Sequence, residues 1–186
     1  MSSIENEPQP QFLITEMTVG DIEPATRMRL QSWADTYINN SAGVTSEWIE
    51  QHNQVQLSPE KQKSRQERFL VGKQKNTFNA WVAKDSKGNI IGSTTPFIDE
   101  DGTQRVGSMY VDKEWLGKGV GNQLMQKVIG WFDSAKPIEL TVVSYNERAK
   151  AFYKKWGFEE IPGSIVLHDG GVIPEIRMIR RPGDEI

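Results

Sequence analysis

The chain has 186 residues, 37% hydrophobic and 25% charged, which is typical of one globular domain with a core of its own. Its net charge of −3 gives no electrostatic reason to expect nucleic acid as a partner, because proteins that bind it usually carry a basic face. The lack of cysteine excludes disulfides and thiolate metal sites, and two histidines disfavour a multi-histidine site, so we expect no metal.

The N-terminal segment is polar and acidic, and we expect a flexible tail over residues 1–10 followed by a single domain over residues 11–181. The segment lacks the basic and then apolar pattern of a secretion signal. No apolar run approaches the ~18 residues that a membrane-spanning helix needs. We therefore expect a cytoplasmic protein without a membrane partner.

The N-terminal part is expected to hold one strand and three helices. An apolar run over 12–17 predicts the strand, and apolar residues at helical spacing from 21 to about 39 predict the first helix. Ser46 is the expected N-cap of the second helix, and Ser58 that of the third. The charge run at 61–68 in the third helix is interpreted as an exposed face.

The rest of the chain alternates strands with helices. The expected elements are strands over 78–84, 90–97 and 105–111, a helix over 120–132, a strand over 138–143, a helix from Asn146 to Gly157, and two strands joined by a turn at 168–171. The first three strands, with short polar turns between them, predict an antiparallel meander. The whole order predicts a mixed sheet with helices on its faces, an α/β (α+β) fold.

The segment "LGKGVG" at 116–121 stands between a strand and a helix, where backbone amides and a helix dipole can face an anion. Glycine allows the close approach that this requires. A nucleotide P-loop would need Ser or Thr after its Gly-Lys pair, whereas Val120 follows the second glycine here. A dinucleotide fingerprint needs GxGxxG in a parallel β–α–β unit, whereas GxGxG follows an antiparallel meander here. Both nucleotide interpretations therefore fail.

The same segment resembles the central motif of the GNAT superfamily of acetyl-coenzyme A-dependent N-acetyltransferases. That motif is Gln or Arg, two residues, Gly, one residue, and Gly or Ala. A second block, "LTVVSYNERAKAFYKKWGF" at 140–158, is similar to the closing part of this family's cofactor half. The resemblance extends from about residue 78 to residue 158. It implies the GNAT fold, with the strands 105–111 and 138–143 splayed apart as strands 4 and 5 of the sheet.

The resemblance also implies acetyl-coenzyme A as the cofactor. The residues implied to hold it are Met109, Tyr110, Val111, Leu116, Gly117, Lys118, Gly119, Val120, Gly121, Asn146 and Tyr153. Amides of 116–121 would hold the pyrophosphate, and the backbone of 109–111 would pair with the pantetheine arm. Leu116 stands where the family usually has Gln or Arg, so we expect backbone, rather than side chain, to hold the phosphates.

Tyr153 is the catalytic candidate, because a phenol near the cofactor sulfur can protonate the departing thiolate. Packing in the core is the alternative role for Tyr153, and capping of a helix is the alternative for Asn146. The general base stays open. Many GNAT relatives carry a glutamate near the start of the fourth strand, where this chain has no carboxylate at 105–108. Asp35, Glu47 or a relayed water are the candidates.

We therefore expect an N-acetyltransferase that moves the acetyl group of acetyl-coenzyme A directly to the primary amine of a small molecule. The helical segment before residue 78 loosely resembles that of bacterial small-molecule members, including polyamine acetyltransferases. A cationic amine suits an acidic protein. A protein or peptide N-acetyltransferase and a non-catalytic acetyl-coenzyme A-binding module are the alternatives, and the chain is expected to be a monomer or a homodimer.

Overall fold

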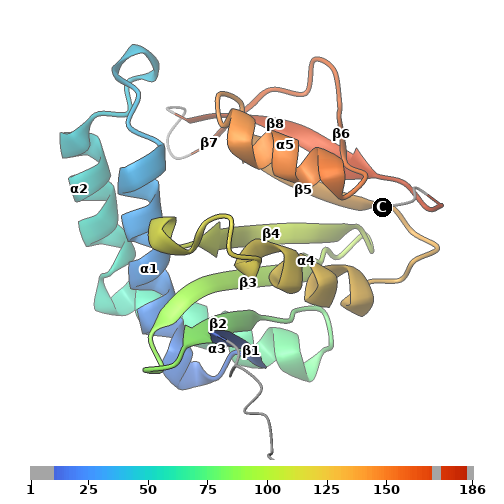
Figure 1. Cartoon of the computed structure of the whole chain (residues 1–186), viewed down its shortest axis with the longest axis horizontal. Helices are drawn as coiled ribbons and strands as arrows, with labels where there is room; N and C mark the ends of the chain where they lie inside the picture. Colours follow the sequence, from blue (N-terminus) through green and yellow to red (C-terminus); the bar gives the residue numbers. More distant parts are fainter. Residues whose placement is uncertain (1–10, 169–172, 184–186) are drawn as a thin grey trace, which may run out of the picture.

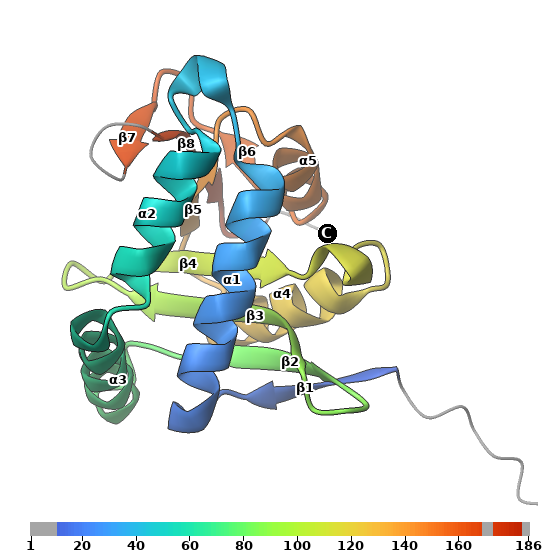
Figure 2. The same cartoon turned by 90° about the vertical axis from the view of Figure 1, so that its left-hand side faces the viewer.

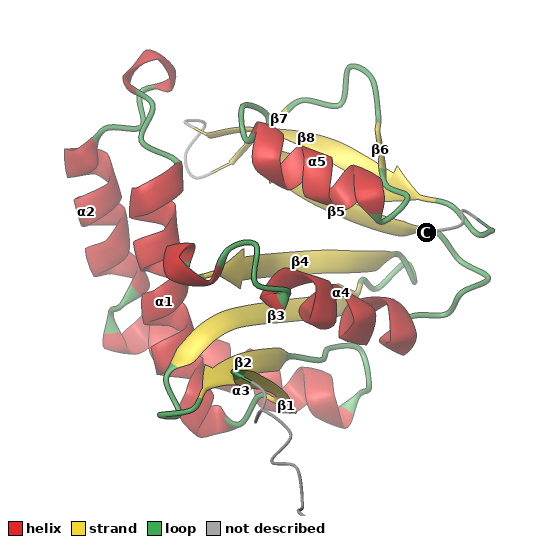
Figure 3. Ribbon diagram, viewed as in Figure 1, coloured by secondary structure: helices red, strands yellow, loops and turns green. Residues whose placement is uncertain are grey.

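A computed structural model describes residues 11–168 and 173–183 (Figures 1 and 3). The expected tail at 1–10 and most of the expected turn at 168–171 lie outside the described residues. Within them, helices and strands follow the order predicted from the sequence with small shifts in their bounds, except that a short strand at Glu159–Glu160 was not predicted. No helix of the described ranges combines the length and the apolar character needed to cross a membrane.

Eight strands of the described chain form one sheet, in the order β1-β2-β3-β4-β5-β8-β6, with β7 also paired to β8. They are β1 (Phe12–Glu16), β2 (Trp81–Asp85), β3 (Ile90–Ile98), β4 (Gln104–Val111), β5 (Ile138–Val143), β6 (Glu159–Glu160), β7 (Val166–His168) and β8 (Ile173–Arg180). The predicted meander β2-β3-β4 is confirmed, and β1 extends it antiparallel to β2. Among the paired strands only β4 and β5 run parallel. The mixed α/β class is thus confirmed.

The helices cover both faces of the sheet (Figures 1 and 2). They are α1 (Ile22–Thr36), α2 (Ser46–Gln56), α3 (Pro59–Gln74), α4 (Val120–Trp131) and α5 (Glu147–Lys155), with short 3-10 turns η1 (Val19–Asp21), η2 (Asn40–Ala42) and η3 (Lys113–Trp115). Helix α1 crosses one face of β3 and β4, and α4 packs on the opposite face. The two faces of the sheet therefore offer different surroundings to anything bound between its strands.

The N-caps of α2 and α3 show how local sequence sets the helix starts. Ser58 caps α3, as predicted, and its hydroxyl accepts from the Lys61 amide at 3.4 Å. The prediction of Ser46 as the cap of α2 is wrong by one residue. Thr45 has the extended backbone of a cap, and its hydroxyl accepts from the Trp48 amide at 3.1 Å. Ser46 is the first helical residue instead.

Three apolar clusters form the core. The largest lies between α4, α5 and the sheet, where Leu124 and Met125 are fully buried. A second packs α1 and α3 on β2 around Phe69. The third joins Trp33 of α1 to Val143 of β5. This third cluster attaches the C-terminal strands to the N-terminal helices, and so connects the two halves of the sheet across the junction of β4 and β5.

The parallel strands β4 and β5 pair over three positions only, from Gln104 opposite Ile138 to Val106 opposite Leu140. At this point β4 also bulges against β3. Between the pairs Thr94–Met109 and Pro96–Val106, two residues of β4, 107 and 108, stand opposite the single residue Thr95. Gly107 is required there, because an added Cβ would lie 2.7 Å from the Phe97 ring and from the Thr95 carbonyl oxygen. The expected splay of strands 4 and 5 is confirmed.

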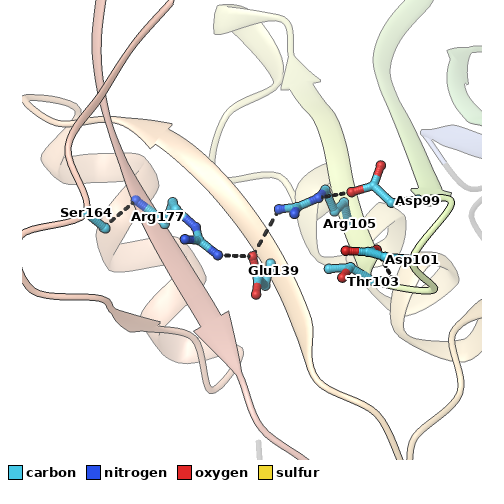
Figure 4. Close-up of polar contacts among 7 residues, drawn as sticks. All are labelled: Asp99, Asp101, Thr103, Arg105, Glu139, Ser164 and Arg177. Atoms are coloured by element: carbon cyan, nitrogen blue, oxygen red, sulfur yellow. Dashed lines mark hydrogen bonds and ion pairs between the residues drawn. The ribbon is translucent and has the colours of Figure 1, made fainter.

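A row of charged side chains crosses the sheet at the paired end of β4 and β5 (Figure 4). Glu139 of β5 accepts from Arg105 of β4 at 3.0 Å and from Arg177 of β8 at 2.7 Å. Arg105 also pairs with Asp99, which follows β3. The Glu139 side chain is only 14% exposed, whereas that of Arg177 is 40% exposed, so the carboxylate is the best shielded part of these contacts. We call Asp99, Arg105, Glu139 and Arg177 the ionic row; it links β4, β5 and β8 where the splay begins.

Candidate functional site

The splay of β4 and β5 opens a cavity of about 540 Å³, which we call the splay cavity. Most residues that the sequence assigned to a cofactor line it: Met109, Tyr110, Val111, Leu116, Gly117, Gly119, Gly121, Asn146 and Tyr153. Two side chains lie elsewhere. Val120 is fully buried in the core, and the Lys118 ammonium stands 5.0 Å from the centre of the Trp115 ring. Any part of these two residues in binding a ligand would therefore come from their backbone.

The turn before α4 presents backbone donors to this cavity. Gly117 and Gly119 have φ values of 75° and 88°, a left-handed conformation that residues with a Cβ rarely adopt. Gly119 is the N-cap and has no side chain to accept from the first turn of α4. The N–H groups of that turn are therefore open to a ligand, at the positive end of the helix dipole. This arrangement suits an anion such as a pyrophosphate.

The inner edge of β4 offers a second set of backbone groups. β4 continues to Val111, but its pairing with β5 ends at Val106 in the described chain. The N–H and C=O groups of 107–111 that point toward β5 consequently face the splay cavity. An extended ligand could pair with them as a strand does. No group of three His, Asp or Glu side chains suited to a metal ion occurs in the described residues.

Tyr153 of α5 lines the splay cavity. Its ring packs between Phe152 and Phe158, with centroids 5.4 and 5.9 Å away, and the residue is 8% exposed. Burial, followed by the nearby Tyr110 and Glu175, raises the pKa of the Tyr153 phenol above its usual range. The phenol thus stays protonated, the state that a general acid needs. Core packing and a place in the cavity are compatible for Tyr153.

Asn146 is the N-cap of α5, and its side-chain oxygen accepts from the Ala149 amide at 3.1 Å. The capping role is thereby confirmed. Asn146 also lines the splay cavity. The cap uses the side-chain oxygen, and the Asn146 side chain also forms a hydrogen bond with the Tyr37 hydroxyl.

A second cavity, of about 890 Å³, lies between the sheet and the helices α1 and α3; we call it the helix-side cavity. The two cavities share the lining residues Gly107, Ser108, Tyr110, Thr141 and Glu175. All of these lie on β4, β5 or β8, at or beside the place where the pairing of β4 with β5 stops. A molecule in one cavity can thus meet a molecule in the other at the splay. The interpretation of 61–68 as an exposed face is partly wrong, because Arg65 and Arg68 line the helix-side cavity.

Glu175 is the residue that sequence reasoning missed. It stands on β8 opposite Val143 and Val166, its side chain is 17% exposed, and it borders both cavities. Its carboxylate lies 3.3 Å from Nε2 of His168. Only the register of β8 against β5 brings this carboxylate to the splay, so no local motif could have indicated it.

The base candidates proposed from the sequence lie elsewhere. Asp35 accepts from the Lys113 ammonium at 3.1 Å, and Glu47 stands in the exposed first turn of α2. Neither lines the splay cavity or the helix-side cavity. Glu175 is the carboxylate that borders both cavities and can accept a proton at the place where they meet.

Residues 76–160 match the family model described as an acetyltransferase (GNAT) domain. No curated protein matches the chain. The PaiA N-acetyltransferase of Thermoplasma acidophilum, solved with coenzyme A, is 21% identical, with a TM-score of 0.68 over 92% of this chain and 99% of that one. The ribosomal-protein-S5-alanine acetyltransferase of Vibrio fischeri is 16% identical, with a TM-score of 0.67 over 96% of this chain and 97% of that one.

A spermidine N-acetyltransferase chimera from Vibrio cholerae and hSSAT is 15% identical, with a TM-score of 0.57 over 93% of this chain and 96% of that one. At these identities the likeness establishes the fold and leaves the substrate open. The family model covers the meander, the glycine turn, α4, β5 and α5. Residues 76–160 are thus similar to a GNAT acetyltransferase domain, and the chain shares the fold of these acetyltransferases.

Proposed function

We propose that the protein is an N-acetyltransferase that moves the acetyl group of acetyl-coenzyme A directly to the primary amine of a small molecule. The observation that carries this proposal is the meeting of two cavities at the splay, one with open backbone donors and one on the opposite face of the sheet. Coenzyme A in the PaiA structure of Thermoplasma acidophilum supports the choice of cofactor.

The splay cavity fits acetyl-coenzyme A in two features. The amides at the start of α4, after the left-handed Gly119, would hold the pyrophosphate. The amides of Leu116 and Lys118 already donate to the carbonyls of Lys113 and Trp115, each at 3.4 Å. The free edge of β4 would pair with the pantetheine arm. Leu116 lines the cavity but has no polar side-chain atom, so the phosphates would depend on backbone donors.

Acetyl-coenzyme A, when bound, supplies the acetyl thioester, and the residues around the splay handle the protons. Glu175 would accept the proton that the amine nitrogen loses as its bond to the carbonyl carbon forms. Tyr153 would donate its proton to the sulfur as the C–S bond breaks. A backbone N–H of β4 would stabilise the oxyanion between these steps. With no cysteine in the chain, direct attack by the amine needs no cysteine-bound intermediate.

The helix-side cavity favours a small-molecule acceptor over a peptide. Its volume of about 890 Å³ lies in the range of about 300–1,000 Å³ that is typical of small-molecule sites. A peptide or protein acceptor would need an open groove along the surface. The ribosomal-protein-S5-alanine acetyltransferase has the same fold, so a protein acceptor stays the alternative.

The test combines acetyl-coenzyme A titration by calorimetry with thiol release across amino acids, phosphorylated amines, polyamines, alkylamines and a peptide N-terminus. We expect the Tyr153→Phe variant to bind the cofactor within about threefold of wild type and to lose about 10²-fold in kcat. Tyr145→Phe is the matched control, since the Tyr145 hydroxyl donates to the Tyr37 carbonyl at 3.0 Å. Cofactor binding without thiol release from any amine would indicate a non-catalytic binding module. Absence of cofactor binding would refute both functions.

A further inference from the structure

Three arginines line the helix-side cavity: Arg29 on α1, and Arg65 and Arg68 on α3. Arg65 is held in place, because it donates to the Gln56 carbonyl oxygen at 2.7 Å and also to the Gln56 side chain. Burial, followed by the charges of Arg29 and Arg68, lowers the pKa of Arg65 to about 10. Because the three guanidinium groups line one cavity, we call them the arginine cluster.

The arginine cluster is not neutralised by the protein in the described residues. Arg29, Arg65 and Arg68 each lack an ion pair there, whereas Arg27 on the outer side of α1 pairs with Glu23 at 2.7 Å. Like charges gathered at a partly buried surface repel one another. A bound anion would remove this cost, and guanidinium groups match the geometry of carboxylate and phosphate.

The acidic residues of the helix-side cavity lie apart from the arginine cluster or pair with other side chains. Asp99 pairs with Arg105 in the ionic row, and Glu175 lies beside His168 at the splay. Glu100 is exposed, in the turn after β3. The cavity thus has a cationic wall on the helices and a carboxylate at the splay, where the reaction would occur.

Tyr110 connects these two regions. Its hydroxyl accepts from the Trp33 indole nitrogen at 2.7 Å, and the Arg29 guanidinium stands 6.0 Å from the centre of the same Trp33 ring. Burial raises the pKa of Tyr110; Arg29 opposes this effect and Glu175 adds to it. The charges of Arg29 in the arginine cluster and of Glu175 at the splay thus both act on the Tyr110 phenol. A molecule that bridges Arg29 and Glu175 along Tyr110 would carry an anionic and an amino group.

We propose that the acceptor is a small amine that also carries an anionic group, a carboxylate or a phosphate, and that Arg29, Arg65 and Arg68 bind this group while the amine faces Glu175. This inference rests on the proposed acetyltransferase function. It differs from the expectation of a polyamine, because a second ammonium group of a polyamine would lie against the arginine cluster and be repelled.

The experiment compares matched acceptors by thiol release: ω-amino carboxylic acids of increasing length, aminoalkyl phosphates, the amides of the same acids, alkylamines and polyamines. We expect kcat/KM for the best anionic amine to exceed that for its neutral isostere by about 10- to 100-fold. The carboxylate and phosphate series separate the two sources of the charge. Equal or better transfer to neutral amines or polyamines would overturn the proposal.

Variants test whether the arginine cluster causes the preference for anionic amines. Arg68→Gln and the double variant Arg29→Gln/Arg68→Gln should raise KM for the anionic amine by about 10-fold for each arginine, and so reduce the ratio of its kcat/KM to that of its neutral isostere. Arg68 is exposed, so the single variant should fold even where the double one does not. Arg27 lies on α1, as Arg29 does, but is paired with Glu23, so the control variant Arg27→Gln should match wild type. Unchanged selectivity in Arg68→Gln and the double variant would refute the assignment.

A binding measurement separates this inference from the proposed function. Addition of the anionic amine without acetyl-coenzyme A should raise the melting temperature of wild type and not that of Arg68→Gln. If no amine is acetylated, the proposed function fails, and the melting-temperature shift still decides the inference. A shift in wild type alone would support the arginine cluster as an anion site, and no shift would overturn it.

Discussion

Glu175 and Tyr153 both border the splay cavity, but the proposed reaction needs Glu175 without a proton and Tyr153 with one. Burial raises the pKa of Tyr153, so its phenol keeps a proton to donate. Glu175 stands on another strand, with His168 at 3.3 Å, and is an acceptor in its ionised form. Proton donor and proton acceptor thus come from different elements, α5 and β8. A direct transfer between amine and thioester uses both groups, because the amine loses one proton and the thiolate gains another.

The first prediction concerns Glu175→Gln, which keeps the volume of the side chain and removes its ability to accept a proton. We expect kcat to fall by about 10²-fold, with cofactor affinity within about threefold of wild type. The remaining rate should rise with pH, as the free amine form of the acceptor becomes more abundant in solution. Steady-state thiol release over a pH series measures both effects. Asp35→Asn is the control, and a loss in that variant but not in Glu175→Gln would reassign the base.

At the scale of elements, the turn before α4 is set by backbone conformation. Gly119 holds a left-handed φ of 88°, while Gly130, near the other end of the same helix, has no positive φ and no neighbour where a Cβ would stand. The two glycines of one helix therefore differ in what they contribute. Gly119 permits the turn that exposes the amides. Gly130 lowers the stability of the helix and is not required by a turn or by a close neighbour.

We expect Gly119→Ala to lower the free energy of unfolding by about 1–2 kcal/mol, because alanine is strained in the left-handed region. The same variant should weaken acetyl-coenzyme A binding, since relief of the strain would move the amides. Gly130→Ala should raise the free energy of unfolding by about 0.5 kcal/mol and keep cofactor affinity. Urea denaturation and calorimetry measure the two quantities. Equal effects of the two substitutions would show that the left-handed turn is not required.

Local patterns predicted the elements and the cofactor side of the site better than its acceptor side. The strands, the left-handed glycines and the cap Asn146 each depend on neighbours within a few residues, so a sequence pattern can indicate them. The place of Glu175 depends on the pairing of β8 with β5, and the arginine cluster depends on the packing of α1 against α3. These contacts join segments far apart in the chain, and no local periodicity encodes them. The two-residue strand β6 escaped prediction for the same reason.

At the scale of the whole molecule, three tyrosines from different elements are buried around the splay. Tyr37 ends α1, Tyr110 lies on β4 and Tyr153 on α5, and burial raises the pKa of each phenol. All three are members of the apolar clusters that hold the helices on the sheet or pack against them. Ionisation of these phenols would place charge inside the packing that joins the two halves of the sheet.

The third prediction is a loss of stability in alkaline solution. The folded pKa of each tyrosine is higher than its unfolded value of about 10, so the unfolded state releases protons first. The tyrosine contribution should be complete below about pH 10 and should fall as pH rises toward the folded pKa, by up to about 1.4 kcal/mol per pH unit for each phenol. Urea midpoints between about pH 9 and pH 11 measure the slope. Tyr37→Phe should reduce it, and an unchanged slope would contradict the assignment.

The ionic row at the start of the splay constrains how this protein can change by mutation. Its charges alternate in sign, and Glu139 touches two guanidinium groups at once (Figure 4). Loss of Asp99 would leave the other three members paired. Loss of Glu139 alone would leave Arg105 paired with Asp99 and would remove this partner from Arg177. The effect of a substitution at Glu139 should therefore depend on the residue at position 177, so that substitutions at these two positions of the sheet are coupled.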